Sequence, residues 1–188
     1  MLKQLKEYRK FVEISGFRSI KVGDARTFAG AICEGLPNNV EFQFFDANLV
    51  ASWQHLYFAA LNALAAFKAK RAISKSLAVE TALYASSQRQ IKKAIALIGL
   101  KSDSSNVAVL ILGNSADSVK AGLTTVAKRL GAEPDETVLA LSEAKAKQIR
   151  RAFDVSETEL ETVSSGRDTS HALVNLVVER VALLSTRL

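Results

Sequence analysis

The chain has 188 residues, of which 48% are hydrophobic, and a formal net charge of +6. This length and composition predict one compact globular domain over residues 1–188 and exclude an intrinsically disordered chain. The positive charge favours an acidic partner such as a nucleic acid.

The first third of the chain predicts strands on either side of one ambiguous segment. Residues 11–22 mix apolar and polar side chains and predict one or two short strands. Residues 24–35 are ambiguous, although their apolar side chains have helical spacing and Gly35 would end a helix there. Residues 40–46 are short and rich in phenylalanine, which predicts a buried strand.

Three helices are predicted next. Residues 48–70 form the clearest one, because apolar side chains recur every three or four positions and would share one face. A second helix is expected over residues 76–85. A third is expected to begin at Ser87, where Gln90 completes a capping-box pattern, and to end at Gly99.

The middle of the chain predicts a strand, a helix and a second strand. Residues 107–112 are a continuous apolar run between polar or glycine neighbours, as in a buried strand. Ser115 is expected to cap a helix that ends at Gly131. Residues 137–141 have the composition of another short strand.

Residues 142–188 predict helices joined by loops, without a further strand. Residues 142–153 form a basic helix with a serine cap, and Ser156 with Glu159 gives a second capping box. Residues 164–168 read as a loop, after which Ser170 is expected to cap the last helix.

This order of elements favours the α+β class, because strands and helices are interspersed without regular alternation. The expected architecture is a small, mostly antiparallel sheet surrounded by several helices. We find no linker, repeat or low-complexity segment in the sequence, which again predicts a single domain.

The residue types that can act in catalysis or bind metals are scattered along the sequence and form no known motif. Neither His55 nor His171 lies in a nucleophile motif, and His55, within the long helix, is expected to be packed or at a rim instead of catalytic. Cys33 alone makes neither an internal disulfide nor a zinc site, which is typical of an intracellular protein. We therefore expect no enzyme activity, no metal and no cofactor. No signal peptide or membrane-spanning run is recognised, so a soluble cytoplasmic protein is expected.

Two groups of cationic and polar residues flank the second predicted helix and form a candidate nucleic-acid site. If the two helix ends meet, they make one positive pocket, because arginine binds phosphate through two hydrogen bonds and helix starts attract anions. The alternative interpretation is that these side chains are simply solvated. The candidates are Lys68, Lys70, Arg71 and Lys75, then Arg89, Gln90, Lys92 and Lys93.

The last predicted helix carries apolar residues on more than one face. A surface helix needs only one apolar stripe, so the surplus is buried either within the domain or against another protein. Both possibilities stay open from the sequence. The candidate partner contacts are Leu173, Leu176, Val177, Arg180, Val181 and Leu184.

Three sequence blocks resemble a known family. The first has Phe45-Asp46-Ala47, His55-Leu56, Ala60, Asn62-Ala63 and Ala66-Phe67. The second has Ile73-Ser74-Lys75, Val79-Glu80, Leu83-Tyr84, Ser87-Gln88-Arg89-Gln90-Ile91, Ala94-Ile95 and Gly99; the third has Glu179-Arg180 and Ala182-Leu183-Leu184. Together these blocks resemble the small subunit of the KEOPS complex, the CGI-like family of PRPK-binding proteins, in its archaeal form.

The resemblance implies a fold and a role. The fold is a small mixed sheet with helices packed around it. The role is a non-catalytic subunit of the complex that attaches threonylcarbamoyl to an adenosine beside the anticodon of tRNAs, a transfer made by a separate subunit. The family member binds the complex's small atypical kinase/ATPase, and in archaea it helps to capture tRNA through the single-stranded CCA end.

The resemblance also assigns residues. The family motif covers Lys75, Arg89 and Gln90, and the other basic candidates extend it by charge alone. The last helix would dock on the kinase. Tyr84 is the nearest ring that could stack on a base, although a core position is the favoured interpretation. Residues 85–87 depart from the family, since a glycine is expected in that turn.

Three alternatives are set against this role. A protein-only adaptor would bind the kinase without touching RNA. A DNA-binding regulator would need a base-reading helix, and the alanine- and leucine-rich helices here are poor ones. A stand-alone enzyme would need acid–base pairs that the sequence does not bring together.

Overall fold

The computed structural model describes residues 1–164 and 168–186. By its contacts the chain divides into two compact units, each described by itself. The expectation of a single domain therefore stays a prediction. The sheet unit comprises residues 1–47 and 99–139, and the helical unit comprises residues 48–98 and the described part of 140–188.

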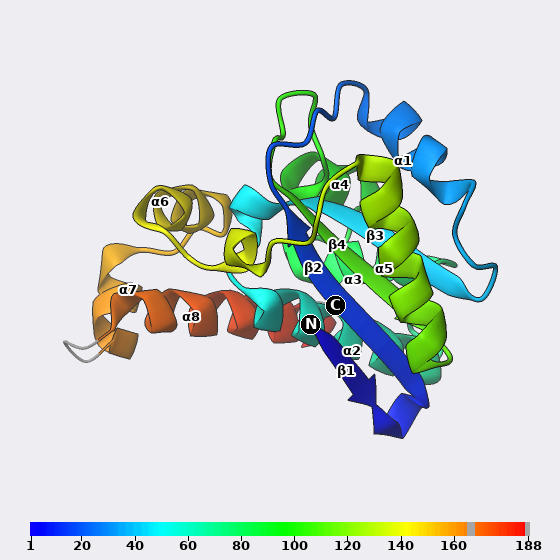
Figure 1. Ribbon diagram of the computed structural model, residues 1–188. Helices are drawn as coiled ribbons and strands as arrows, with labels where there is room; N and C mark the ends of the chain where they lie inside the picture. Colours follow the sequence, from blue (N-terminus) through cyan, green and yellow to red (C-terminus); the bar gives the residue numbers. More distant parts are fainter. Residues whose placement is uncertain (165–167, 187–188) are drawn as a thin grey trace. The chain divides into compact units, whose positions relative to one another are not determined.

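The sheet unit is built on four antiparallel strands in the order β1-β2-β4-β3 (Figure 1). Every residue of β4 is buried, as its continuous apolar run predicts. This sheet, with the helices of both units, confirms the α+β class. β1 was not predicted from the sequence. The strands are β1 (Leu2–Leu5), β2 (Lys10–Phe17), β3 (Val40–Asp46) and β4 (Val107–Gly113).

Two helices belong to the sheet unit, α1 (Ala25–Cys33) and α5 (Ala116–Leu130). The ambiguous segment is thus a helix, and its start is fixed by the Asp24 carboxylate, which accepts the Thr27 N–H at 2.8 Å. α5 lies along one face of the sheet (Figure 1) and begins after Ser115, as predicted.

The strand predicted over residues 137–141 is wrong, since a 3₁₀ turn forms at Glu136–Leu139. The Asp135 carboxylate accepts the N–H and the hydroxyl of Thr137, which closes a turn that a strand cannot contain. The apolar residues of this segment still reach the core, because Gly16 has no side chain. A Cβ there would lie 2.7 Å from the Asp135 carbonyl oxygen.

The helical unit contains six described α-helices. α2 packs against α3 and α8, α3 also against α4, and α7 against α8. Nearly all of α3 is buried, which makes it the central helix of the unit. The helices are α2 (Trp53–Lys68), α3 (Leu77–Ser86), α4 (Ile91–Ile98), α6 (Glu143–Ala152), α7 (Glu157–Ser164) and α8 (Thr169–Leu183).

Three predicted helix starts are wrong. α2 begins after a cap at Ser52, later than residue 48, because a 3₁₀ turn occupies Ala47–Leu49. Ser87 does not start α4; it ends α3 with a left-handed backbone, φ +53°, and its N–H bonds back into α3. α8 is capped by Asp168 instead of Ser170, since the Asp168 carboxylate accepts two helix N–H groups.

The second capping box is confirmed. The Ser156 N–H donates to the Glu159 carboxylate at 2.8 Å, and the Glu159 N–H donates to the Ser156 hydroxyl at 3.2 Å. Of the loop predicted over residues 164–168, Ser164 closes α7 and Asp168 caps α8. Residues 165–167 lie outside the described residues.

Candidate functional site

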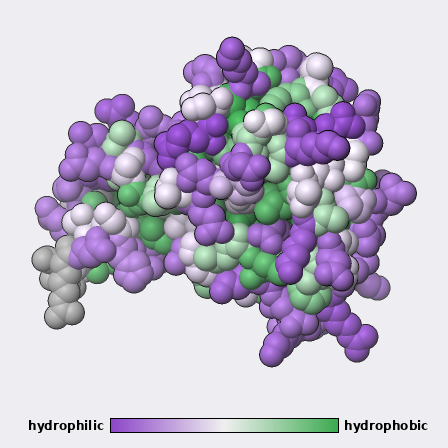
Figure 2. Space-filling view, in the orientation of Figure 1, coloured by the Kyte–Doolittle hydropathy of each residue, from purple (hydrophilic) through white to green (hydrophobic). Residues whose placement is uncertain are grey.

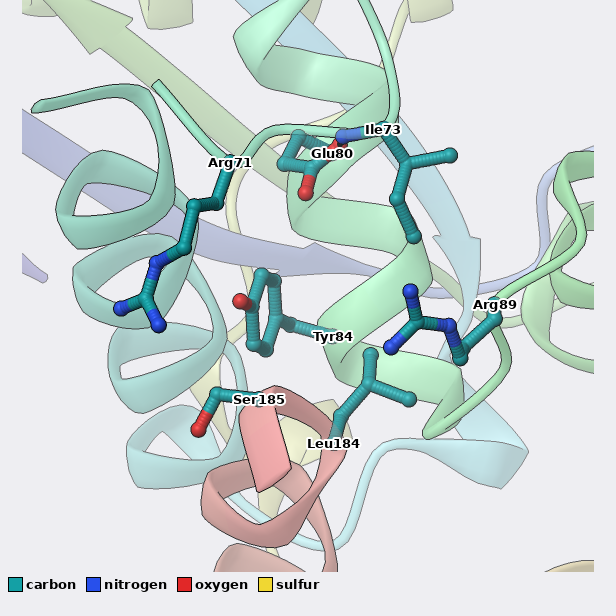
Figure 3. A pocket seen from close by; sticks show the side chains of 7 residues that line it. All are labelled: Arg71, Ile73, Glu80, Tyr84, Arg89, Leu184 and Ser185. Atoms are coloured by element: carbon teal, nitrogen blue, oxygen red, sulfur yellow. Dashed lines mark hydrogen bonds between the residues drawn. The ribbon is translucent and has the colours of Figure 1, made fainter. Parts of the chain in front are cut away.

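A pocket of about 70 Å³ opens on the helical unit (Figure 3), and we call it the arginine pocket. It is formed by the chain after α2, by α3 and the chain after it, and by the 3₁₀ turn Leu184–Thr186 that follows α8. Its lining residues are Arg71, Ile73, Glu80, Tyr84, Arg89, Leu184 and Ser185.

The arginine pocket joins the two predicted basic groups. Arg71 belongs to the first group and Arg89 to the second, and Figure 3 shows them on opposite sides of Tyr84. The two helix ends therefore meet, as the positive-pocket interpretation requires. An anion-binding role for these residues stays a prediction. The other candidates are exposed and do not line the pocket: Lys68, Lys70, Lys75, Gln90, Lys92 and Lys93.

Both arginines follow the same kind of helix ending. At the end of α2, Lys70 has φ +56° and the Arg71 N–H donates to the Ala66 carbonyl at 2.9 Å. At the end of α3, Ser87 is left-handed and the following N–H donates to the Leu83 carbonyl at 3.0 Å. These are Schellman-type endings, which reverse the chain just past the helix. The left-handed Ser87 belongs to the turn 85–87, in which the family resemblance leads one to expect a glycine.

Glu80 fixes the segment before α3 that contains Ile73, one of the lining residues. Its side chain is 1% exposed, and one carboxylate oxygen accepts the N–H groups of Ile73 at 3.0 Å and Ser74 at 2.7 Å. Ser76 caps α3 directly after this segment. Sequence reasoning missed this role; the sequence shows only a glutamate in the first turn after Ser76, which favours the helix start.

Tyr84 is both a core residue and a pocket residue. The side chain is 7% exposed, and its hydroxyl lies on the Arg71 side of the pocket (Figure 3). Burial raises the pKa of the phenol, and the charge of Glu80 raises it further, while Arg71 and Arg89 oppose the shift. The hydroxyl therefore stays protonated near neutral pH and can donate a hydrogen bond.

His55 is packed in the helical unit, as expected. Its Nδ1 accepts the Ala51 N–H at 3.2 Å, and its Nε2–H donates to the Ala85 carbonyl at 2.7 Å. Burial lowers its pKa to about 4. The neutral imidazole thus ties the start of α2 to the end of α3, directly before the Ser87 turn.

The candidate partner contacts on α8 are mostly buried. Leu173, Leu176, Val177 and Val181 are each at most 4% exposed, and Leu184 lines the arginine pocket. Their burial follows the first of the two possibilities that the sequence left open. A partner-binding role for these residues stays a prediction.

Arg180, the sixth candidate, binds other parts of the helical unit. Its guanidinium donates to the carbonyls of Phe153 at 2.8 Å and Asp154 at 2.9 Å, and to the Glu159 carboxylate at 2.9 Å. Hydrogen bonds from Ser156, together with Arg180, lower the pKa of Glu159 to about 2. Arg180 thus fixes the turn between α6 and α7 to α8.

The accessible apolar residues of α8 form a different set. Leu183 is 41% exposed, and Val174 and Val178 are partly exposed one helical turn apart. Leu183 lies about two and a half turns from Val174, at the opposite edge of the exposed side of α8, across Asn175 and Glu179. We call Val174, Val178 and Leu183 together the α8 stripe.

The face seen in Figure 2 is mainly hydrophilic, and its apolar residues form small separate patches. Within residues 1–164 and 168–186, no helix combines the length and apolar character needed to cross a membrane. In the same part of the chain, no three His, Cys, Asp or Glu side chains gather as metal ligands would.

Comparison with known proteins covers both surfaces. The family described as "Kinase binding protein CGI-121" matches residues 20–185, a range that contains the whole arginine pocket and the α8 stripe. The chain is also similar to the "Regulatory protein Cgi121" of Methanocaldococcus jannaschii. The two are 31% identical over 116 residues, which are 62% of this chain and 72% of that protein.

Proposed function

Because this chain belongs to the CGI-121 family of kinase-binding proteins, we propose that it is a non-catalytic regulatory subunit of the KEOPS complex. In this role it binds the small atypical kinase/ATPase of the complex and the 3′ CCA end of tRNA. It supports threonylcarbamoyladenosine modification without carrying the transfer itself. Family membership, first recognised as a resemblance in the sequence blocks, supports the kinase-binding part.

The arginine pocket supports the RNA-binding part. The observation that supports RNA binding is that Arg71 and Arg89, which follow two separate helix ends, line one pocket on opposite sides of the neutral Tyr84. Guanidinium groups bind phosphates through paired hydrogen bonds, and a flexible single strand can place a phosphate between them. The net charge of +6 would favour the approach of any nucleic acid.

The α8 stripe is the surface we propose for the kinase. Val174 and Val178 leave apolar area exposed at one edge of the accessible side of α8, and Leu183 does so at the opposite edge, while the remaining side is buried. A partner that covers the stripe would remove this area from water, which stabilises a complex.

Gel-shift titration tests the RNA-binding proposal. Intact tRNA is compared with the same tRNA lacking CCA, using wild type, Arg89→Glu and Arg151→Glu. Arg151 is a matched control, since it is an exposed arginine in the same unit and does not line the arginine pocket.

The expected result is a loss of at least about tenfold in affinity for the trimmed tRNA and for Arg89→Glu, with a small effect of Arg151→Glu. Unchanged binding of trimmed tRNA and of Arg89→Glu would overturn the pocket assignment. A protein-only adaptor would then be the better description of this chain.

A further inference from the structure

Glu80 is the acidic residue of the arginine pocket, and the two oxygens of its carboxylate have different surroundings. Both hydrogen bonds described for it fall on Oε2, which accepts the N–H groups of Ile73 and Ser74. Figure 3 shows the other oxygen, Oε1, pointing towards Tyr84 and the interior of the pocket. Oε1 thus presents a hydrogen-bond acceptor to whatever enters.

We propose that Oε1 of Glu80 accepts a hydrogen bond from a ribose hydroxyl of the terminal nucleotide of an RNA strand. The pocket would then select strands that end in a free 2′,3′-diol over strands that end in a phosphate. This inference rests on the proposed binding of an RNA 3′ end. It adds which chemical terminus is accepted and names the residue that decides it.

The chemistry of the carboxylate carries the selection. A carboxylate only accepts hydrogen bonds, so it attracts hydroxyl or amine donors and repels a phosphate. Glu80 is buried, and its Oε2 is fixed by two backbone N–H groups. The carboxylate therefore cannot rotate away from a phosphate that approaches Oε1. Arg71 and Arg89 line the same pocket and supply guanidinium groups for the phosphate that joins the last nucleotide to the strand.

The charge on either side of the sugar favours an end over an internal nucleotide at Oε1. An internal ribose has a phosphate on each side, whereas the last ribose of an unphosphorylated strand presents two hydroxyls. Such an end can approach Oε1 without bringing a second phosphate.

Fluorescence anisotropy with short single-stranded RNAs ending in CCA tests the proposal. Three termini are compared at one fixed salt concentration: the 2′,3′-diol, a 3′-phosphate and a 2′,3′-dideoxy end, which keeps the base and removes the hydroxyls. Wild type is expected to bind the diol at least about tenfold more tightly than either altered end.

The variant Glu80→Gln tests the residue. Its amide oxygen can still accept the N–H groups of Ile73 and Ser74, while its NH₂ group would face the pocket as a donor. This variant is expected to bind RNA without preferring the diol and to bind the 3′-phosphate end as tightly or more tightly. Glu179→Gln, an exposed change on α8, is the matched control and keeps the preference.

The outcomes separate this inference from the proposed function. Equal wild-type affinity for the three termini overturns the terminal selection and leaves RNA binding intact. Binding of none of them overturns both. A preference that persists in Glu80→Gln shows that another residue makes the selection, and overturns the role of Glu80. The wild-type comparison decides the selection whether or not the variant folds.

Discussion

His55 is held as a neutral imidazole, because burial lowers its pKa from 6.5 to about 4. Between these pKa values the unfolded chain binds a proton that the folded chain does not. The free energy of unfolding therefore falls as pH drops from above 6.5 to about 4, by on the order of 3 kcal/mol, and this contribution is constant below that range. Denaturant unfolding near neutral pH and near the folded-state pKa of about 4 measures this change in the free energy of unfolding. His55→Gln should reduce the acid sensitivity; equal sensitivity in both proteins would contradict the prediction.

The endings of α2 and α3 place both arginines, yet neither left-handed position is a glycine. At Ser87 the strain adds to a buried hydroxyl oxygen that has no hydrogen-bond partner among the described residues. Ser87→Gly removes both penalties and is expected to raise the free energy of unfolding by about 1 kcal/mol, measured in urea. Ser86→Gly is the matched control. Ser86 is the last residue of α3, and its hydroxyl donates to the Leu83 carbonyl. Removal of this side chain is expected to lower the free energy of unfolding by a similar amount. A less stable Ser87→Gly protein would contradict the account of this turn.

The whole molecule presents two surfaces that can be tested separately, the arginine pocket and the α8 stripe. Leu183→Glu is expected to weaken binding of the KEOPS kinase/ATPase by at least about tenfold and to leave RNA affinity nearly unchanged, because a charge would be buried at the contact. Arg89→Glu is expected to do the reverse. Val163→Glu, at a similarly exposed apolar residue of α7, is the matched control for kinase binding by calorimetry. Kinase affinity unchanged in Leu183→Glu would exclude the stripe as the docking surface.

Local chemistry made much of the fold predictable. A short phenylalanine-rich segment marked β3, a continuous apolar run marked β4, and serine caps marked the starts of α5 and α6. Each of these signals depends on neighbours within a few residues. They fail where two local structures share a residue type, as at Ser87, since serine followed by glutamine resembles a helix start when the chain is in fact leaving a helix.

The candidate site was predictable only in part. Charge clustering pointed to Arg71 and Arg89, but it could not separate them from the exposed lysines nearby, because the selection is made by the packing of α2, α3 and α8. Burial of most of the candidate contacts on α8 has the same origin. The role of Glu80 was missed because it depends on the path of the preceding loop.

The lining of the arginine pocket has a consequence for the timing of biosynthesis. Leu184 and Ser185 are the last lining residues to leave the ribosome, long after both arginines. A nascent chain that has already folded α2 and α3 therefore carries both arginines without the lining from Leu184 and Ser185. Under the proposed function, the complete pocket for an RNA end forms only after α8 has been synthesised and packed.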